Sequence, residues 1–315
     1  MTRLAFVRSL LGGAALAGLG SARAQTLAGP PRAARLPTRP LGRTGYAVGL
    51  FSLGGQATIE DPARRSEAVA IVNRALDLGV NYIDTAAGYG GGASEVAIGE
   101  VMRTRRTEVF LASKTHDRSY DGSMRLLETS LRRLHTDHLD LWQLHNVKTD
   151  TDLGFAFSRE GAVRAMERAR AQGLVRFTGI TGHQDPHVIR RAIERYPFDA
   201  ALLALNAADR HDSASFIEHV LPSAAERGLA VIGMKIPGRG KLLRADGVRT
   251  MEQAMRYVLT LPISTVIAGI STLAELEENV AIARDFRPLP PEEMAELERL
   301  TRPYFADALW YRHGY

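Results

Sequence analysis

The 315-residue sequence contains no cysteine. This absence excludes disulfide bonds, thiolate metal sites and cysteine nucleophiles, and with them zinc-finger and iron–sulfur proteins. No block of lysine and arginine is interleaved with aromatic residues, so nothing here indicates a nucleic-acid-binding surface. The run "HTDH" at 135–138 falls in a predicted helix-to-strand loop, so we interpret its histidines as solvated and predict no metal site.

Residues 1–24 have the composition of an export signal. Arg3 and Arg8 frame a charged start, "SLLGGAALAGLG" is apolar, and Ala22-Arg23-Ala24 has the A-x-A form of a cleavage site. We therefore expect an exported, periplasmic protein with no stable membrane insertion after the signal is removed. Because the two arginines are not adjacent, a folded-export signal and an ordinary secretory signal both stay open; a retained anchor or a cytoplasmic location is less favoured.

The rest of the chain alternates between apolar runs and amphipathic segments. Residues 25–40 contain four prolines and predict a linker or extended arm, with the folded domain over 41–315. Amphipathic segments at 61–79, 122–135, 160–173 and 213–228 predict helices, three of which end at Gly79, Gly173 and Gly228, where a C-cap belongs. Apolar runs predict strands at 47–55, 80–86, 108–114, 138–145, 174–182, 198–206, 229–235 and 264–270.

Eight strands, each followed by a helix, predict an α/β fold of the (β/α)8 TIM barrel type. A doubly wound open sheet is the alternative. It is weakened because no G-x-G-x-x-G run follows an early strand.

Four polar residues stand at or just after the ends of three consecutive predicted strands: Asp84, Tyr89, Lys114 and His145. In a barrel such positions share one mouth, although each residue taken alone has an ordinary structural explanation. A buried lysine needs an opposite charge, so we expect Lys114 to pair with Asp84. A cation near a phenol lowers the pKa of that phenol, which would make Tyr89 a general acid, and His145 could hydrogen-bond the same carbonyl oxygen.

These residues resemble the catalytic residues of the aldo-keto reductase family. The resemblance rests on "NYIDTAAGYG", "ASK" and "LDLWQLH" with their spacing, and it extends from "LGRTG" at 41 to "LEENVAIA" near 283. It implies a barrel that reduces the carbonyl group of a small-molecule substrate with NAD(P)H, with Tyr89 as the acid.

The resemblance also implies a cofactor site at the ends of the last strands. "MKIPGRGKL" at 234–242 offers glycines and cations to a pyrophosphate, and "GISTLAELEENV" at 269–280 offers a helix start capped by Ser271 or Thr272. The implied cofactor contacts are Gly55, Thr181, His183, Asn206, Lys235, Pro237, Gly238, Arg239, Gly269, Ser271, Thr272, Glu275, Glu278 and Asn279.

Two positions depart from the family pattern. Members that prefer NADPH often carry a cation where this chain has Ser271, and Glu275 suits a hydroxyl better than a phosphate. The glutamine that holds the nicotinamide amide in the family corresponds to Ala204, so His183 and Asn206 substitute for it or the ring is held differently. The expected cofactor is NADP(H) or NAD(H), with NADP(H) only modestly favoured.

Two further functions stay open. The altered nicotinamide pocket favours, as the alternative, a non-catalytic regulatory or binding protein that holds cofactor on the same barrel. A barrel lyase or isomerase using Lys114 for Schiff-base chemistry is a third hypothesis. Nothing in the sequence indicates a particular oligomeric state. Candidate residues for an apolar substrate wall are His116, Tyr120, Trp142, Trp310 and Tyr311.

Overall fold

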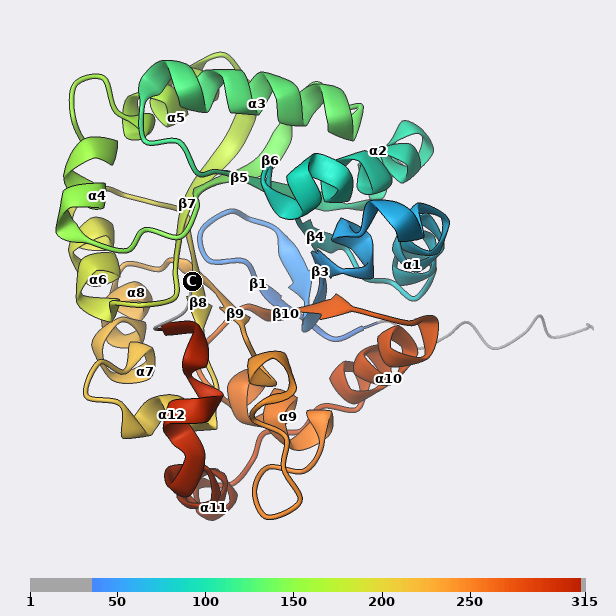
Figure 1. Ribbon diagram of the computed structural model, residues 1–315, viewed down its shortest axis with the longest axis vertical. Helices are drawn as coiled ribbons and strands as arrows, with labels where there is room; N and C mark the ends of the chain where they lie inside the picture. Colours follow the sequence, from blue (N-terminus) through green and yellow to red (C-terminus); the bar gives the residue numbers. More distant parts are fainter. Residues whose placement is uncertain (1–35, 313–315) are drawn as a thin grey trace, which may run out of the picture. The chain divides into compact units, whose positions relative to one another are not determined.

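Eight parallel strands close into a barrel in the computed structural model, which describes residues 36–312 (Figure 1). The barrel closes where the last strand pairs with the first. Each predicted strand region contains one barrel strand, so the predicted (β/α)8 fold is confirmed. The barrel strands are β3 (Phe51–Ala57), β4 (Tyr82–Asp84), β5 (Phe110–Thr115), β6 (Leu139–Leu144), β7 (Val175–Gly182), β8 (Ala200–Ala204), β9 (Ala230–Met234) and β10 (Thr265–Ile270).

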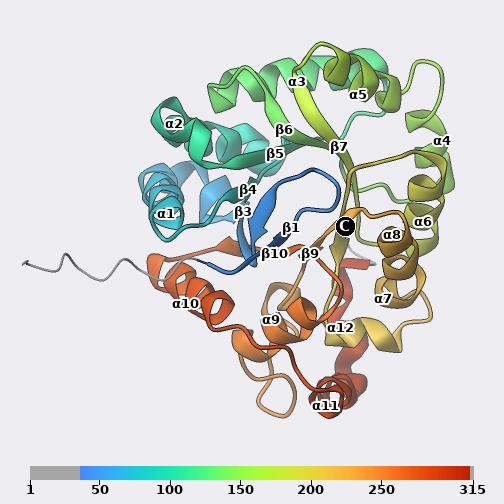
Figure 2. The ribbon, with the colours of Figure 1, turned by 180° about the vertical axis from the view of Figure 1, so that it is seen from behind.

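Helices surround the barrel and cover the outer faces of its strands (Figures 1 and 2). Because both faces of the strands are covered, their continuous apolar runs are buried. The helices are α1 (Arg65–Asp77), α2 (Ala93–Arg105), α3 (Tyr120–Leu134), α4 (Asp150–Ala156), α5 (Ala162–Ala171), α6 (Pro186–Arg195), α7 (Phe216–His219), α8 (Leu221–Glu226), α9 (Met251–Thr260), α10 (Leu273–Arg284), α11 (Pro291–Thr301) and α12 (Phe305–Ala308).

The predicted helix ends are confirmed, with one correction. Gly79, Gly173 and Gly228 have φ values of 90°, 73° and 63°, which is the left-handed conformation that a glycine adopts after a helix. The single helix expected at 213–228 is instead two short helices, α7 and α8. Pro222 lies at the start of α8, where its missing N–H is tolerated, whereas a continuous helix would place its ring against an earlier carbonyl.

An antiparallel hairpin of β1 (Thr38–Pro40) and β2 (Ala47–Gly49) closes the end of the barrel where the strands begin (Figure 2). Gly42 approaches the barrel so closely that a Cβ there would lie 2.3 Å from the amide nitrogen of Ala230. Residues 38–40, the last part of the linker or extended arm expected over 25–40, form β1, and the strand expected at 47–55 spans β2 and the start of β3. The export signal expected over 1–24 lies outside the described residues.

No helix within residues 36–312 is both long enough and apolar enough to span a bilayer.

The Asp140 side chain connects three neighbouring strands, β5, β6 and β7, near the ends at which they begin. Its Oδ2 accepts hydrogen bonds from the Leu111 amide of β5 at 2.9 Å and from Arg106 at 2.8 Å. Its Oδ1 accepts from Arg176 of β7 at 2.8 Å. The carboxylate is almost fully buried, so its removal would leave the buried Leu111 amide without its side-chain acceptor and would break the ion pair with the partly buried Arg106.

We expect Asp140→Ala to lower the free energy of unfolding by about 2–4 kcal/mol, because the buried Leu111 amide and the partly buried Arg106 lose this acceptor. Asp137→Ala, three residues earlier, is the matched control, since the Asp137 side chain is 93% exposed and should matter by less than about 0.5 kcal/mol. Urea denaturation of both variants measures the difference. Equal losses in the two variants would show that Asp140 does not stabilise the strand ends.

Candidate active site

The four polar residues singled out in the sequence meet at the end of the barrel where the strands finish. Asp84 is the last residue of β4, Lys114 lies near the end of β5, and His145 directly follows β6. Tyr89 begins a short 3-10 turn in the loop after β4. The Nζ of Lys114 donates to the hydroxyl of Tyr89 at 3.3 Å and to the backbone carbonyl of Thr85 at 2.8 Å.

Asp84 and Lys114 form an ion pair that is almost completely shielded from water. Each residue is 1% exposed. Burial acts to lower the pKa of Lys114, but the negative charge of Asp84 and the hydrogen bonds to Asp84 and Tyr89 outweigh it, so the pKa is raised. Lys114 is therefore a fixed cation whose remaining N–H groups are already engaged.

The pKa of Tyr89 corrects one expectation. Burial raises the pKa of this phenol, and the charge of Lys114, which acts to lower it, does not overcome that effect. The desolvation of the phenol outweighs the charge of Lys114, a balance that the sequence pattern could not reveal. Tyr89 is thus a neutral phenol at neutral pH, which is the form that can donate a proton.

His145 lies edge-on to Tyr89, with ring centroids 5.6 Å apart. Burial and the nearby charge of Lys114 hold its pKa well below 6.5. A neutral imidazole carries one N–H, so His145 can donate a hydrogen bond without bringing a second positive charge into the mouth.

Gln143 is a member of this cluster that the sequence reasoning missed. It is fully buried on β6, and its Nε2 donates to the Oδ1 of Asp84 at 3.0 Å. Its Oε1 has no hydrogen-bond partner within residues 36–312. The sequence does mark this residue, because Gln143 lies in the mainly apolar run "LDLWQL" and a buried glutamine needs a hydrogen-bond partner.

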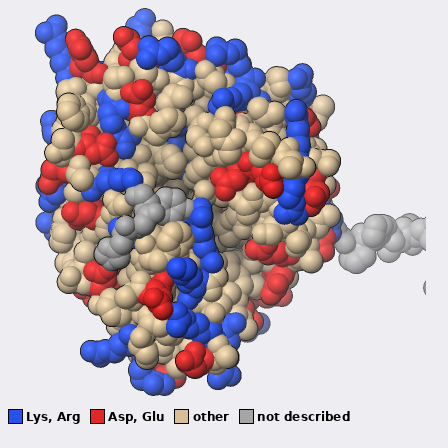
Figure 3. Space-filling view, in the orientation of Figure 1, with Lys and Arg blue, Asp and Glu red and all other residues tan. Residues whose placement is uncertain are grey.

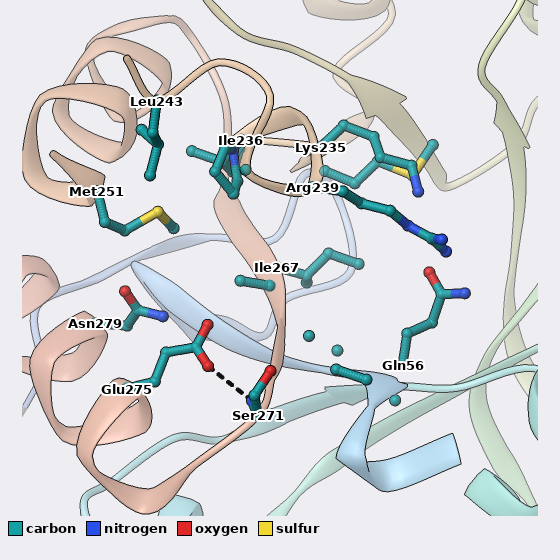
Figure 4. A pocket seen from close by; sticks show the side chains of 18 of the residues that line it. Gln56, Lys235, Ile236, Arg239, Leu243, Met251, Ile267, Ser271, Glu275 and Asn279 are labelled. Carbon is teal, nitrogen blue, oxygen red and sulfur yellow. Dashed lines mark hydrogen bonds between the residues drawn. The ribbon is translucent and has the colours of Figure 1, made fainter. Parts of the chain in front are cut away.

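A cavity of about 760 Å³ runs from Asp84 and Tyr89 to the start of α10. Figure 3 shows basic side chains gathered beside a hollow on this face of the molecule. In Figure 4, Gln56, Lys235 and Arg239 lie toward one end of the cavity, and Ser271, Glu275 and Asn279 toward the other. Of the expected cofactor contacts, those that line it are Gly55, His183, Lys235, Pro237, Arg239, Gly269, Ser271, Glu275, Glu278 and Asn279.

Four expected cofactor contacts do not line this cavity. Asn206 caps a turn through the Ala208 amide at 3.0 Å and donates to Tyr311 at 3.1 Å. The Thr181 hydroxyl accepts from the amide of Asn146 at 2.8 Å. Thr272 caps α10, and Gly238 accepts a hydrogen bond from the Trp310 indole. These groups build the surrounding loops.

The basic residues of the cavity affect one another. Burial and the charge of Arg239 lower the pKa of Lys235 to about 8. Burial and the charge of Lys235 lower the pKa of His183 to about 3, and the His183 Nδ1 lies 2.9 Å from the side-chain amide oxygen Oδ1 of Asn146. Because that oxygen can only accept, Nδ1 carries the proton of a neutral ring.

The end of the cavity at α10 has the features of a site for a polar, elongated ligand. Asn279 is 2% exposed, and its Nδ2 has no hydrogen-bond partner in the described part of the chain. The Ser271 amide, which would be open to an anion at this helix start, donates instead to the Glu275 carboxylate at 2.7 Å (Figure 4). A dinucleotide fits this cavity for three reasons. Glycine backbone at Gly54 and Gly55 forms one side, and the cations Lys235 and Arg239 lie along it. At the far end, the buried side-chain amide of Asn279 has no hydrogen-bond partner among the described residues.

The expected apolar substrate wall does not border the cavity. Trp142 is fully buried on β6, on the face opposite to Gln143, and Tyr120 begins α3. The Trp310 indole donates to Gly238 at 3.1 Å, and Tyr311 is buried against His183. Neither these residues nor the exposed His116 line the cavity.

The "HTDH" histidines lie away from this mouth, where His135 contacts Arg103 and His138 contacts Asp137. Within residues 36–312 no group of three or more histidine, aspartate or glutamate side chains is arranged to hold a metal ion.

Comparisons with known proteins agree with this geometry. The sequence profile of the aldo/keto reductase family matches residues 47–247. The chain is 25% identical to L-galactose dehydrogenase of Arabidopsis thaliana, over 85% of this chain and 95% of that protein. An aldo-keto reductase of Bacillus halodurans in its holo form superposes with a TM-score of 0.72 at 26% identity, covering 84% of this chain and 96% of the other. An aldo/keto reductase of Klebsiella pneumoniae, solved with NADP and acetate, gives 0.71 at 26% identity over 85% and 96%.

The fold and the clustered side chains define an oxidoreductase built on a (β/α)8 barrel. The chain belongs to the aldo-keto reductase family.

The depressed pKa of His183 predicts that acid destabilises the fold. Below its ordinary value of 6.5 the unfolded chain binds a proton that folded His183 does not bind until the pH approaches about 3. Stability is therefore lost as the pH falls through this window, by up to about 1.4 kcal/mol per pH unit for one such group.

We expect His183→Gln to reduce that slope between pH 6 and pH 4, and the exposed His116→Gln to leave it unchanged. Urea unfolding at several pH values measures both slopes. If the slope of His183→Gln equals that of the parent protein, the buried ring is not held neutral.

Proposed function

We propose that the protein reduces the carbonyl group of a small molecule with NAD(P)H, with Tyr89 donating the proton. The observation that carries this proposal is that one buried lysine, Lys114, bonds both the Asp84 carboxylate and the Tyr89 hydroxyl. A bound nicotinamide cofactor supplies a hydride to the carbonyl carbon. The protein must then supply a proton to the carbonyl oxygen and limit the charge that develops there.

Each side chain has a distinct task in this proposal. Tyr89 gives its phenolic proton to the carbonyl oxygen as the hydride arrives, and the phenolate left behind is stabilised by the charge of Lys114. Asp84 keeps Lys114 charged, and Gln143 holds Asp84 in place. Neutral His145 donates its N–H to the same oxygen and orients the carbonyl. Solvent then returns a proton to Tyr89.

The two competing functions receive less support. Lys114 is poorly suited to Schiff-base chemistry, because its Nζ is buried, charged and bonded to three acceptors. A cofactor-holding protein without turnover would not need a phenol held against a buried cation. That second function is tested by the same variants, since it predicts cofactor binding with negligible turnover in the parent protein.

We expect Tyr89→Phe to lower kcat by about 10²–10⁴-fold, because the proton donor is lost while the cavity is unchanged. Cofactor affinity should stay within about threefold, since the phenol contributes little to dinucleotide binding. Steady-state kinetics and calorimetric titration measure the two quantities. Near-parental kcat would contradict the assignment of Tyr89 as the acid. Circular dichroism of the variant shows whether a loss of kcat comes from unfolding instead.

The proposed cofactor is NAD(P)H, and the structure bears on which form is preferred. The Klebsiella pneumoniae relative solved with NADP supports NADP(H). Against it, Ser271 supplies no cation, its amide is taken by Glu275, and a 2′-phosphate near this carboxylate would be repelled. This geometry weakens the modest preference for NADP(H) that the family resemblance implied.

We expect Ser271→Arg combined with Glu275→Gln to raise the affinity for NADPH over NADH by about tenfold or more, because a repulsive charge is replaced by an attractive one. Glu277→Gln is the matched control on the same helix, as Glu277 pairs with Arg74 and does not line the cavity. Calorimetric titration with each nucleotide measures the ratio. An unchanged ratio would mean that the adenosine ribose binds elsewhere.

We further propose that residues 1–24 direct export and are removed. The apolar run, its flanking arginines and the A-x-A site support this proposal. Cell fractionation and intact-mass measurement of the full chain, expressed in a Gram-negative host, test it. A periplasmic protein beginning at Gln25 is expected, and an unprocessed cytoplasmic protein beginning at Met1 would contradict it.

A further inference from the structure

Arg133 of α3 bonds both ends of the loop that carries Tyr89. Its Nη1 donates to the backbone carbonyl of Ala87 at 3.2 Å, and its Nη2 donates to the backbone carbonyl of Gly91 at 3.3 Å. Tyr89 lies midway between these two residues in the sequence. We call residues 87–91 the Tyr89 loop. One guanidinium group from a helix outside the barrel thus contacts this loop on both sides of the phenol.

The backbone of the Tyr89 loop depends on such outside contacts for its conformation. Gly91 and the next residue, Gly92, have φ values of 64° and 105°, and glycine is the residue type with the most conformational freedom to lose on folding. A Cβ at Gly92 would lie 2.2 Å from the Cζ of Arg133, so the backbone passes directly against the guanidinium group. Arg133 is therefore placed to select one conformation of the loop.

A buried carboxylate connects Arg133 to the strand that carries Lys114. Glu95 of α2 is fully buried, and its Oε2 lies 3.3 Å from the Nη1 of Arg133. Its Oε1 accepts a hydrogen bond from the hydroxyl of Ser113 at 2.7 Å. Ser113 directly precedes Lys114 on β5. The loop that carries the phenol and the strand that carries the cation are therefore linked through one ion pair.

The contact between Lys114 and Tyr89 leaves little room for movement of the loop. The Lys114 Nζ lies 3.3 Å from the Tyr89 hydroxyl, which is already long for a hydrogen bond. A displacement of about 1 Å at a reacting group can reduce a rate by about 10²-fold. Arg133 does not line the cavity, so it can influence the reaction only through the groups that it holds.

We propose that Arg133 is a positioning residue for Tyr89, and that Glu95 anchors its guanidinium group. This inference rests on the proposed carbonyl reduction and extends it to a residue outside the cavity. By bonding the carbonyls of Ala87 and Gly91, Arg133 holds the phenol where it meets both Lys114 and the carbonyl oxygen of the substrate. Loss of these two bonds lowers the rate of proton donation and leaves nucleotide binding unchanged.

Arg133→Lys tests this inference with little disturbance of the fold. Lysine keeps a positive charge beside Glu95, but its donors lie on a single nitrogen and do not reproduce the fork of a guanidinium group. We expect kcat to fall by about 10–10²-fold and nucleotide affinity to stay within about threefold, because the phenol is displaced and the cavity is not. Steady-state kinetics with glyceraldehyde, propanal and glyoxylate, and calorimetric titration with each nucleotide, measure the two quantities.

Arg132→Lys is the matched control. Arg132 is the preceding residue of α3, is exposed, and bonds Thr129 of the same helix. It should leave kcat unchanged. If circular dichroism shows that Arg133→Lys is unfolded, Arg133→Gln replaces it, and the same loss of kcat is expected. Parental kcat in a folded Arg133 variant would overturn this inference.

The same substitution in a Tyr89→Phe background separates positioning from a general effect on structure. If Arg133 acts through the phenol, Arg133→Lys lowers the single-turnover rate in the parent protein but causes no further loss once Tyr89 is phenylalanine. An equal loss in both backgrounds would overturn this inference alone. Parental kcat in Tyr89→Phe, or no turnover of the three aldehydes by the parent protein with either nucleotide, would overturn the proposed function and this inference together.

Discussion

The buried ion pair of Asp84 and Lys114 is the constraint on which the reacting end of this barrel depends. Neither charge can face water, so each requires the other, and their strands β4 and β5 must be neighbours in the register observed. Once the pair is fixed, its geometry determines where the Tyr89 hydroxyl can bond. Gln143 adds a donor from β6, which ties a third strand to the same carboxylate. The Asp84–Lys114 ion pair thus both stabilises the fold and positions the residue proposed to donate the proton.

The last described residues, 310–312, contact the segments that follow β8 and β9. Arg312 is buried and forms ion pairs with Asp209 and Asp212 in the segment after β8. Trp310 bonds the loop after β9, and Tyr311 bonds Asn206. These contacts tie the segment after β8 to the loop after β9, and the latter borders the cavity. They give the aromatic residues near the C-terminus a structural role in place of the substrate contact expected from the sequence.

Much of the fold and the central cluster could be predicted because the signals are local. Continuous apolar runs at regular intervals locate the barrel strands, and glycines at helix ends locate the turns. Asp84, Tyr89, Lys114 and His145 stand out because they follow apolar runs, and the closed barrel brings strand ends together whatever their distance in sequence. The grouping of these four residues could therefore be predicted from the sequence without knowledge of any contact between them.

The remaining features depend on geometry that no local pattern encodes. Thr181 and Asn206 lie at or just after suitable strand ends, yet their side chains accept hydrogen bonds from the backbone amides of Asn146 and Ala208, and the two residues do not border the cavity. Gln56 and Glu60 reach the cavity through a bulge, which shifts the register by residues that the sequence does not mark. The pKa of Tyr89 depends on whether desolvation of the phenol outweighs the charge of Lys114, so its direction could not be inferred from the presence of a nearby lysine alone.

The most direct test of the central claim is a double-mutant cycle on Asp84 and Lys114, measured as the single-turnover rate of NAD(P)H oxidation with glyceraldehyde. Asp84→Asn, Lys114→Met and the double variant would be compared with the parent protein after saturation with nucleotide. If the pair acts as one unit on Tyr89, the double variant loses no more rate than the slower single variant. Losses that add on a logarithmic scale would show that the two residues act independently, and would contradict this account.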